Sequence, residues 1–190
     1  MNLKVFFAFG IGFVLGLLMP CATEFRGHSP PPPQSARNSL QPAALAMPIA
    51  GIDPFKLKDT FYEMHNGHRH EALDIMAPRG TPVLAVDRGS VAKLFTSKQG
   101  GLTVYEFNDT QQLCYYYAHL DHYASDLKEG QPLNRGQIIG YVGSTGNASP
   151  DAPHLHFAVS LVGPEHHWWQ TTAIDPLPML QGRGQQSPQP

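Results

Sequence analysis

Two histidines separated by one residue form the chemical pattern that first stands out in the chain. They lie in the stretch D-A-P-H-L-H-F, residues 151–157. Side chains alternate faces along a β-strand, so a strand here directs His154 and His156 to one face and the apolar residue after each of them to the other. Two imidazoles on one face are a candidate metal-binding or acid–base site. An H-x-H pair alone is a weak signal, so its partners must come from elsewhere in the chain.

Two polar clusters earlier in the chain offer such partners. His70 and Asp74 stand four residues apart in H-E-A-L-D, a separation that suits one helical turn or a short loop around a single ion. His119 follows the aromatic run Y-Y-Y-A. Imidazole nitrogens and carboxylate oxygens are ordinary zinc ligands, and three protein ligands with one open position are typical of a catalytic zinc site. His70, Asp74 and His156 would complete that set, which leaves His119 and His154 outside it.

The elements that must position these side chains are short β-strands. Eighteen Gly and 18 Pro, with only 15% charged residues, are typical of a turn-rich β protein. Runs of β-forming residues alternate with turn residues, and no long apolar period of 3.6 residues occurs among them. We predict a mainly β domain, an antiparallel β-sheet with long loops, whose strands cover residues 82–86, 90–95, 102–107, 113–119, 137–142 and 154–161.

The ends of the chain have a different composition. Residues 5–19 form an apolar or glycine run behind Lys4, which predicts an N-terminal apolar helix within a signal peptide or membrane anchor at 1–22. Cleavage, an uncleaved anchor and lipidation of Cys21 all remain open. Residues 23–47, with Pro30 to Pro33 in succession, predict a disordered linker, and 181–190 a disordered tail. One domain of residues 48–180 lies between them.

Charge and cysteine content narrow the classes of function. Thirteen basic and 15 acidic residues, with an isoelectric point near 6.5, give no basic footprint for nucleic acid. The two cysteines are Cys21 and Cys114. Because Cys21 adjoins a segment that should lie in or near a membrane, we expect no structural disulfide.

The three clusters together resemble the lysostaphin-type, or LytM-type, metallopeptidases of family M23. The pattern of that family is H-x(3)-D, then a lone His after a small residue, then H-x-H, and the chain has H-E-A-L-D, Y-A-H-L and H-L-H in this order. The resemblance runs from about residue 52 to residue 178 and includes 77–83 and 140–147. One departure is Ala72, where many members carry Gly, but Ala is also small and is not a ligand.

The resemblance implies the lysostaphin-type peptidase fold, with one zinc ion per domain held by His70, Asp74 and His156. It also implies that His119 and His154 act on the attacking water and the substrate. One of the two should take the proton of the water, and the other should hydrogen-bond the developing oxyanion or the leaving amine. The roles stay open, although the shared strand face of His154 and His156 favours His154 as the base.

The implied function is that of a zinc-dependent endopeptidase that hydrolyses peptide cross-links of bacterial peptidoglycan. We expect a monomer in the periplasm or at the cell surface, with its N-terminal segment in the membrane and peptide stems as its substrate. One alternative is a non-catalytic relative that activates another cell-wall hydrolase, although such relatives usually lack one or more of the five site residues. Residues 129–140 also resemble the hairpin of lipoyl and biotinyl domains, but the Met-Lys pair of those carriers is absent.

Other conspicuous residues have plainer interpretations. We expect His65 and His68 at a loop surface or groove rim, His122 on an exposed turn, and Glu71 in solvent, since the H-E-x-x-H spacing is absent. Among the three tyrosines, Tyr116 should face opposite to its two neighbours, with the core on one face and the groove wall on the other. The H-H-W-W stretch at 166–169 should be a loop that packs its tryptophans on the sheet or lines the groove.

Overall fold

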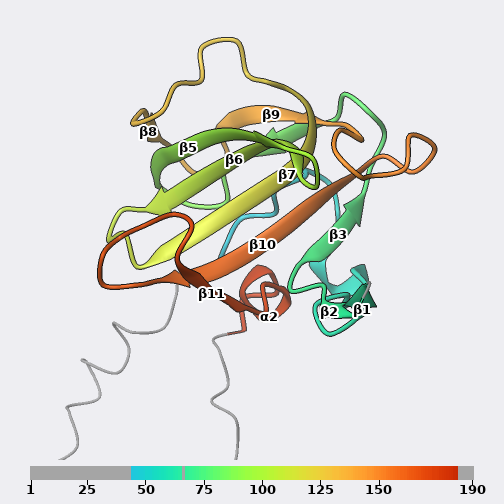
Figure 1. Ribbon diagram of the computed structural model, residues 1–190, viewed down its shortest axis with the longest axis horizontal. Coiled ribbons are helices and arrows are strands. Elements are labelled where there is room, and N and C mark those ends of the chain that lie inside the picture. The colour runs from blue at the N-terminus through green and yellow to red at the C-terminus, as the bar shows by residue number, and fades with distance from the viewer. Residues whose placement is uncertain (1–43, 66, 184–190) are drawn as a thin grey trace, which may run out of the picture. The chain divides into compact units, whose positions relative to one another are not determined.

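The computed structural model describes residues 44–65 and 67–183 (Figure 1). The predicted N-terminal helix and most of the linker and tail lie outside this range. Within it, no helix has the length and apolarity that a membrane span requires.

Nearly all of the secondary structure is antiparallel β. A hairpin of β1 (Met64–His65) and β2 (His68–Arg69) stands apart from a nine-stranded sheet. The sheet contains β3 (Leu73–Met76), β4 (Pro82–Leu84), β5 (Gly89–Ser97), β6 (Gly101–Asn108), β7 (Leu113–Tyr123), β8 (Pro132–Leu133), β9 (Ile138–Val142), β10 (His154–Val162) and β11 (Thr171–Ile174). The described helices are the short η1 (Pro54–Lys56) and α2 (Leu177–Leu180). The predicted fold class is therefore confirmed.

The six predicted strands correspond to β4, β5, β6, β7, β9 and β10. Strand β7 is longer than predicted and continues to Tyr123, so His122 lies in a strand and the prediction of a turn there was wrong. Strand β3 was not predicted. It has only four residues, and the polar residues in and before it were interpreted as a possible site rather than as part of a strand.

Strand β10 is the strand on which the arrangement depends (Figure 1). One of its edges pairs with β7, while the other pairs first with β3 and then with β11. In this register His156 lies opposite Asp74 on one side and Ala118 on the other. A shift of one residue would turn every β10 side chain to the other face, so burial of the apolar face fixes this register.

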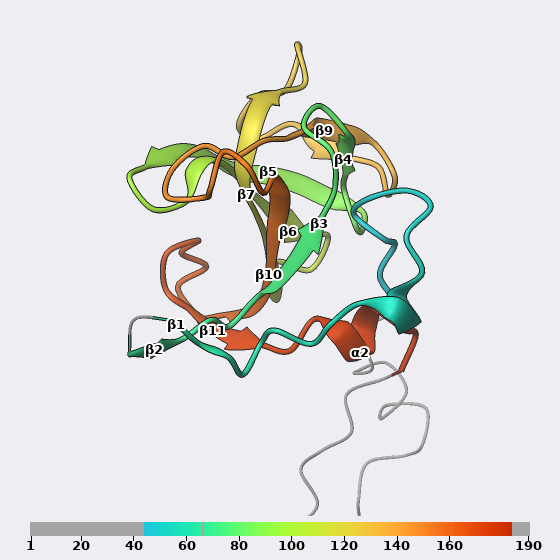
Figure 2. The same ribbon diagram turned by 90° about the vertical axis from the view of Figure 1, so that its right-hand side faces the viewer.

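The core lies on the face of β10 opposite to the histidines. Leu155, Phe157 and Val159 are fully buried there and pack with the fully buried Tyr115 and Tyr117 of β7. On the other side of the sheet, the β1–β2 hairpin and the connections before and after β10 project in the same direction (Figure 2). The open face of β10 is therefore flanked by loops.

One acidic side chain is buried in this core. Glu106 of β6 has no exposed surface, and its Oε2 accepts a hydrogen bond of 2.6 Å from the Tyr117 hydroxyl. Its Oε1 lacks a hydrogen-bond partner among the described residues. Burial raises the pKa of Glu106 to about 8, so this carboxyl is mostly protonated at neutral pH.

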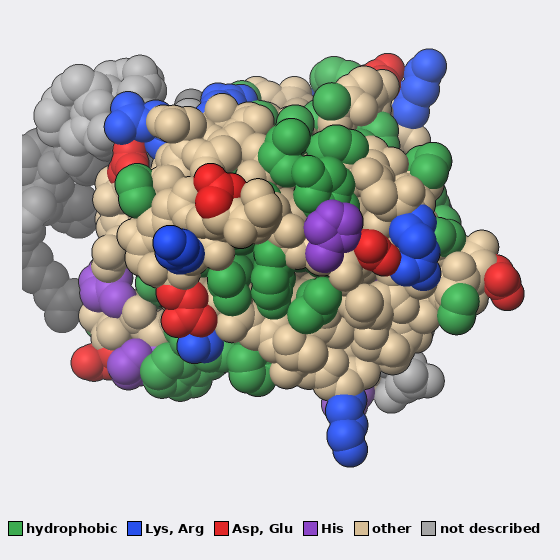
Figure 3. All heavy atoms as spheres, turned by 90° about the horizontal axis from the view of Figure 1, so that it is seen from above, with side chains coloured by type: hydrophobic (Ala, Val, Ile, Leu, Met, Phe, Trp, Pro, Cys, Tyr) green, Lys and Arg blue, Asp and Glu red, His purple; other side chains and the backbone are tan. Residues whose placement is uncertain are grey.

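Charged residues on the outside are mixed in sign. On the face drawn in Figure 3, Lys and Arg side chains alternate with Asp and Glu side chains among uncharged and hydrophobic ones. Some are paired, as in the contacts Lys58–Glu63 and Lys93–Glu129.

Candidate metal centre

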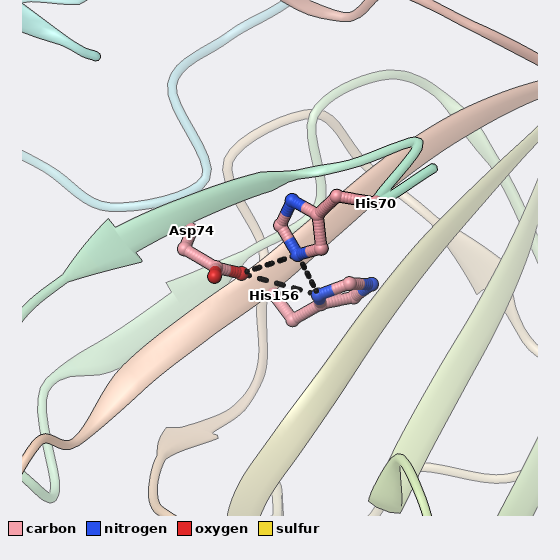
Figure 4. A group of neighbouring side chains, drawn as sticks. All are labelled: His70, Asp74 and His156. Carbon is pink, nitrogen blue, oxygen red and sulfur yellow. Dashed lines mark hydrogen bonds and ion pairs between the residues drawn. The ribbon is translucent and has the colours of Figure 1, made fainter. Parts of the chain in front are cut away.

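Three predicted ligands converge at the point where β3 pairs with β10. The Nε2 of His70, the Oδ1 of Asp74 and the Nδ1 of His156 point toward one another (Figure 4). The two nitrogens are 3.1 Å apart, and the Asp74 oxygen is 3.2 Å from the His70 nitrogen and 3.1 Å from the His156 nitrogen. Three donor atoms from three side chains therefore surround one point.

These distances fit a small tetrahedral cation. Zinc bonds to nitrogen and oxygen at about 2.0–2.2 Å, which separates its tetrahedral ligand atoms from one another by about 3.3–3.6 Å. Burial works to raise the pKa of Asp74, but the hydrogen bond and charge of His156, with further contributions from His70 and His154, lower the pKa overall. The site thus offers one ionised carboxylate and two imidazoles.

The backbone between His70 and Asp74 is not a helical turn. Glu71 has a left-handed φ of 56°, and the chain then enters β3, where Asp74 pairs with His156. A non-glycine residue in this region is unusual, and such residues gather at functional sites. Glu71 itself is exposed, as predicted. The turn at Glu71 brings the His70 ring next to Asp74, and the spacing of the two residues in the sequence does not predict this turn.

Thr60 ties this turn to the site. Its carbonyl lies 3.2 Å from Nδ1 of His70, which leaves Nε2 for the metal. Its buried hydroxyl donates to the Ala72 carbonyl at 3.0 Å and accepts from the Asp74 amide at 3.2 Å. A partner on the far nitrogen of a ligand histidine fixes the tautomer and orientation of the ring. Nothing in the type or spacing of Thr60 pointed to this role.

The two other histidines are held in the same manner. Nδ1 of His119 lies 2.8 Å from the Thr145 carbonyl, and Nδ1 of His154 lies 2.9 Å from the Ala152 carbonyl. A carbonyl can only accept, so each Nδ1 carries a hydrogen and each neutral ring keeps its lone pair on Nε2. That nitrogen of His154 is 3.8 Å from Oδ1 of Asp74.

His119 reaches the site through an irregularity in β7. Strict alternation from the buried Tyr117 would direct His119 into the core. However, His119 has a φ of 59°, and the register of β7 against β6 shifts between Tyr117 and Leu120. This β-bulge returns the buried Leu120 to the core and frees His119 for the site, as bulges do where a side chain must be re-aimed. Burial lowers the pKa of His119 to about 4, which keeps the ring neutral.

The connection between β9 and β10 is fixed against this bulge. Thr145 donates from its hydroxyl to the Leu120 carbonyl at 2.7 Å and accepts from the Leu102 amide at 3.0 Å. Its neighbour Gly146 has a φ of 78°, and a Cβ there would lie 2.2 Å from the Gln99 carbonyl oxygen. The loop that supplies the Thr145 carbonyl is thus held at close range to two strands.

A cavity of about 500 Å³ brings the five predicted site residues together. Its lining consists of His70, Asp74, Gln99, Gly100, Tyr116, His119, Asn147, Ala148, Ser149, His154 and His156. Tyr116 lies on the cavity wall while Tyr115 and Tyr117 are buried, which confirms the predicted alternation.

His68, His122 and the two tryptophans do not line this cavity. His68 is exposed in β2, and His122 is exposed in β7, where it stacks on Tyr141 and approaches Asp121 at 3.0 Å. Trp168 packs on the sheet against Phe95 and Tyr105, whereas Trp169 is largely exposed. His65 falls in β1.

The sequence profile of Peptidase family M23 matches residues 68–176, which contain all five site residues. The chain belongs to this family. It is 34% identical over 116 residues to the L-Ala–D-Glu endopeptidase of Bacillus subtilis (strain 168), a match that covers 58% of this chain and 34% of that protein. It is also 34% identical over 122 residues to lysostaphin of Staphylococcus simulans, with coverage of 63% and 23%.

Solved structures of other proteins share the fold. The catalytic domain of lysostaphin from Staphylococcus simulans superimposes with a TM-score of 0.56 at 31% identity, covering 67% of this chain and 95% of that domain. Csd3 of Helicobacter pylori gives a TM-score of 0.57 at 26% identity, covering 76% of this chain and 37% of that protein. The chain spans about a third or less of the curated relatives named above. The lysostaphin-type fold is therefore confirmed for the domain.

Proposed function

We propose that this M23 protein is a zinc-dependent endopeptidase that hydrolyses peptide cross-links of bacterial peptidoglycan. The observation that carries the proposal is the convergence of three ligand atoms with two further histidines in one cavity. The similarity to lysostaphin and to an L-Ala–D-Glu endopeptidase supports the substrate class.

His70, Asp74 and His156 would hold the zinc ion. A bound zinc ion supplies Lewis acidity, which polarises a carbonyl and activates water near neutral pH. One carboxylate against a divalent cation leaves a net positive charge in the cavity. Such charge favours the oxyanion that develops when a peptide bond is attacked.

His154 and His119 would handle the protons. We assign the general base to His154, because its Nε2 approaches the ligand cluster and its Nδ1 is already occupied by the Ala152 carbonyl. His119 would hydrogen-bond the developing oxyanion or the leaving amine. Imidazoles transfer protons efficiently near neutral pH, and both rings are pre-oriented by main-chain carbonyls.

The proposal extends to the cellular setting. We infer that segment 1–22 directs export and acts as a signal or anchor, that 23–47 is a spacer, and that 48–180 is the peptidase domain with 181–190 as a tail. A monomer in the periplasm or at the cell surface would then reach peptide stems in the wall.

Digestion of purified sacculi by the full-length protein tests the proposal. The protein should contain about one zinc ion per chain and should release peptides whose new ends identify the cleaved bond. His154→Ala provides the matched inactive control. A zinc-free protein that leaves sacculi intact but stimulates a cell-wall amidase would overturn the proposal in favour of the non-catalytic activator.

A further inference from the structure

A row of aromatic rings leads away from the metal cavity along the open face of the sheet. Tyr116 meets the ligand His156 edge to face, with ring centroids 6.0 Å apart. Tyr105 follows at 4.7 Å from Tyr116, and Trp168 at 4.6 Å from Tyr105. Phe95 completes the row at 5.5 Å from Trp168. We call these four residues, Phe95, Tyr105, Tyr116 and Trp168, the aromatic row.

The row is assembled from separate parts of the chain. Phe95, Tyr105 and Tyr116 come from three neighbouring strands, β5, β6 and β7, whereas Trp168 comes from the connection between β10 and β11. That connection is closed by main-chain hydrogen bonds, including those from His166 to Gly163 and from Gln170 to His167. Trp168 thereby contacts Tyr105 and Phe95, which belong to β6 and β5, the strands beyond β7 as counted from β10.

The row is partly open to solvent. Phe95 is 40% exposed, and Tyr105, Tyr116 and Trp168 are partly buried. Soluble proteins seldom leave several aromatic rings open on one surface unless something binds there. Because Tyr116 also lines the metal cavity, a substrate held at the metal can continue directly onto the row.

The floor beside the row has small side chains. Ala158 of β10 lies opposite Tyr116 and follows His156 on the same face of the strand. Ala118 lies opposite His156 on β7 but is fully buried, so Ala158 is the accessible small residue beside the row. Its methyl side chain leaves room for a flat group next to the Tyr116 ring.

We propose that the aromatic row binds a sugar ring of the peptidoglycan glycan strand while the attached peptide lies in the metal cavity. The inference rests on the proposed peptidoglycan substrate. A pyranose ring is uncharged and presents a flat face of C–H groups about as wide as one aromatic ring. The four rings carry no charge, so the carboxylates of the stem peptide would find no cation to pair with in the row.

The distances are compatible with one substrate molecule that occupies both places. The steps from His156 to Trp168 are 6.0, 4.7 and 4.6 Å. An extended peptide advances about 3.3–3.6 Å per residue. A bond held at the metal therefore lies within a few residues of Trp168, which is the scale of a stem peptide.

Binding to a remote part of a substrate can support the chemical step. The kinetic test compares two substrates, a cross-linked peptide that still carries its disaccharides and the same peptide after an amidase has removed them. Wild-type protein should prefer the sugar-bearing form, and Trp168→Ala should lower this preference by about tenfold in kcat/KM. Trp168→Phe should keep most of it, because a ring remains. Phe55→Ala is the control, since Phe55 is an exposed aromatic residue, 61% exposed, that contacts Arg183 instead.

A binding measurement separates this inference from the proposed function. The chain has two tryptophans, so Trp169→Phe leaves Trp168 as the sole fluorescent indole. Its emission should change saturably with soluble glycan strands that carry no peptide, and much less with free stem peptide. That result supports the row even if no hydrolysis occurs. An unchanged emission, or equal loss of activity on both substrates in Trp168→Ala, overturns it.

Discussion

The imidazoles of His119 and His154 meet edge to face, with ring centroids 4.9 Å apart and each Nδ1 on a main-chain carbonyl. The tautomer of both rings is therefore set by the backbone of one loop, the connection between β9 and β10, rather than by another side chain. This differs from a catalytic histidine oriented by a carboxylate, whose orientation one substitution can remove. The orientation of either ring therefore changes only when the histidine is replaced or when that loop is altered.

Removing a ligand and removing a proton-handling histidine should have different effects. His70→Ala or Asp74→Ala should lose zinc and activity together, because two ligands hold the ion poorly. His119→Ala or His154→Ala should keep zinc and lose turnover by about 10²-fold or more. Metal analysis beside a turnover assay checks both statements. Activity retained in His154→Ala would remove that residue from the role of base.

Thr60→Val should weaken zinc binding while the protein stays folded. The substitution keeps the shape and the carbonyl that orients His70, but it removes the hydroxyl that joins Ala72 to Asp74. We expect a loss of about tenfold in zinc affinity, the lower end for a partner of a metal ligand. Competition with a chelator measures it, and Thr60→Ser should restore wild-type affinity. Equal affinities in all three proteins would show that the hydroxyl does not support the site.

Gly146→Ala should impair turnover far more than Gly136→Ala. Both glycines have a positive φ, 78° and 82°, so both substitutions carry a similar backbone strain. Only at Gly146 would the added Cβ collide with a carbonyl oxygen, that of Gln99, while nothing lies within 4 Å at Gly136. The displaced loop should misplace the Thr145 carbonyl and hence His119. We expect a fall of about tenfold or more in kcat for Gly146→Ala with zinc retained.

Comparable kcat values in the two alanine variants would count against this coupling. Circular dichroism and thermal unfolding should accompany the assay, because each variant must be compared as a folded protein. The strain common to both then cancels, and the remaining difference reports the contact with Gln99.

Glu106 should make stability fall as the pH rises. Its pKa is about 8 in the folded protein, against an ordinary value of 4.5 in the unfolded chain. A raised pKa stabilises the fold fully below about pH 4.5, and this stabilisation is lost progressively up to about pH 8. The slope should reach at most about 1.4 kcal/mol per pH unit.

Urea unfolding at several pH values, for the wild type and Glu106→Gln, isolates this contribution. The variant should lack the slope and should gain in relative stability as the pH approaches 8, because glutamine carries no proton to lose. All other titrating groups are common to both proteins. Parallel curves for the two proteins would contradict the raised pKa.

Much of the fold could be predicted from the sequence because its long strands carry a clear alternation. Strands β5, β6, β7 and β10 combine β-forming residues with flanking turns, and each was located to within a few residues. Strands β3, β8 and β11 have four residues or fewer, too few for a periodic signal to emerge. Their positions follow from pairing with longer strands.

The candidate site was predictable as a set of side chains but not as a geometry. Histidine and aspartate are recognisable as potential metal ligands by residue type, so all five residues could be named from the sequence, and the structure brings them together in one cavity. Thr60, Thr145 and Ala152 each orient a histidine ring through a main-chain carbonyl, a group that every residue has, so no sequence pattern marks them. The left-handed backbone of Glu71 and His119 could not be predicted either, because neither residue is a glycine.

The register of β10 makes the site depend on the fold, whereas the fold does not depend on the site. The alternation that buries Leu155 and Phe157 also delivers His154 and His156, so a chain that has folded has already set both rings in place. The side chains on the open face, by contrast, are not part of the hydrophobic core to which Leu155 and Phe157 belong. A descendant could therefore exchange either histidine, lose its chemistry, and survive as a binding protein with the same architecture.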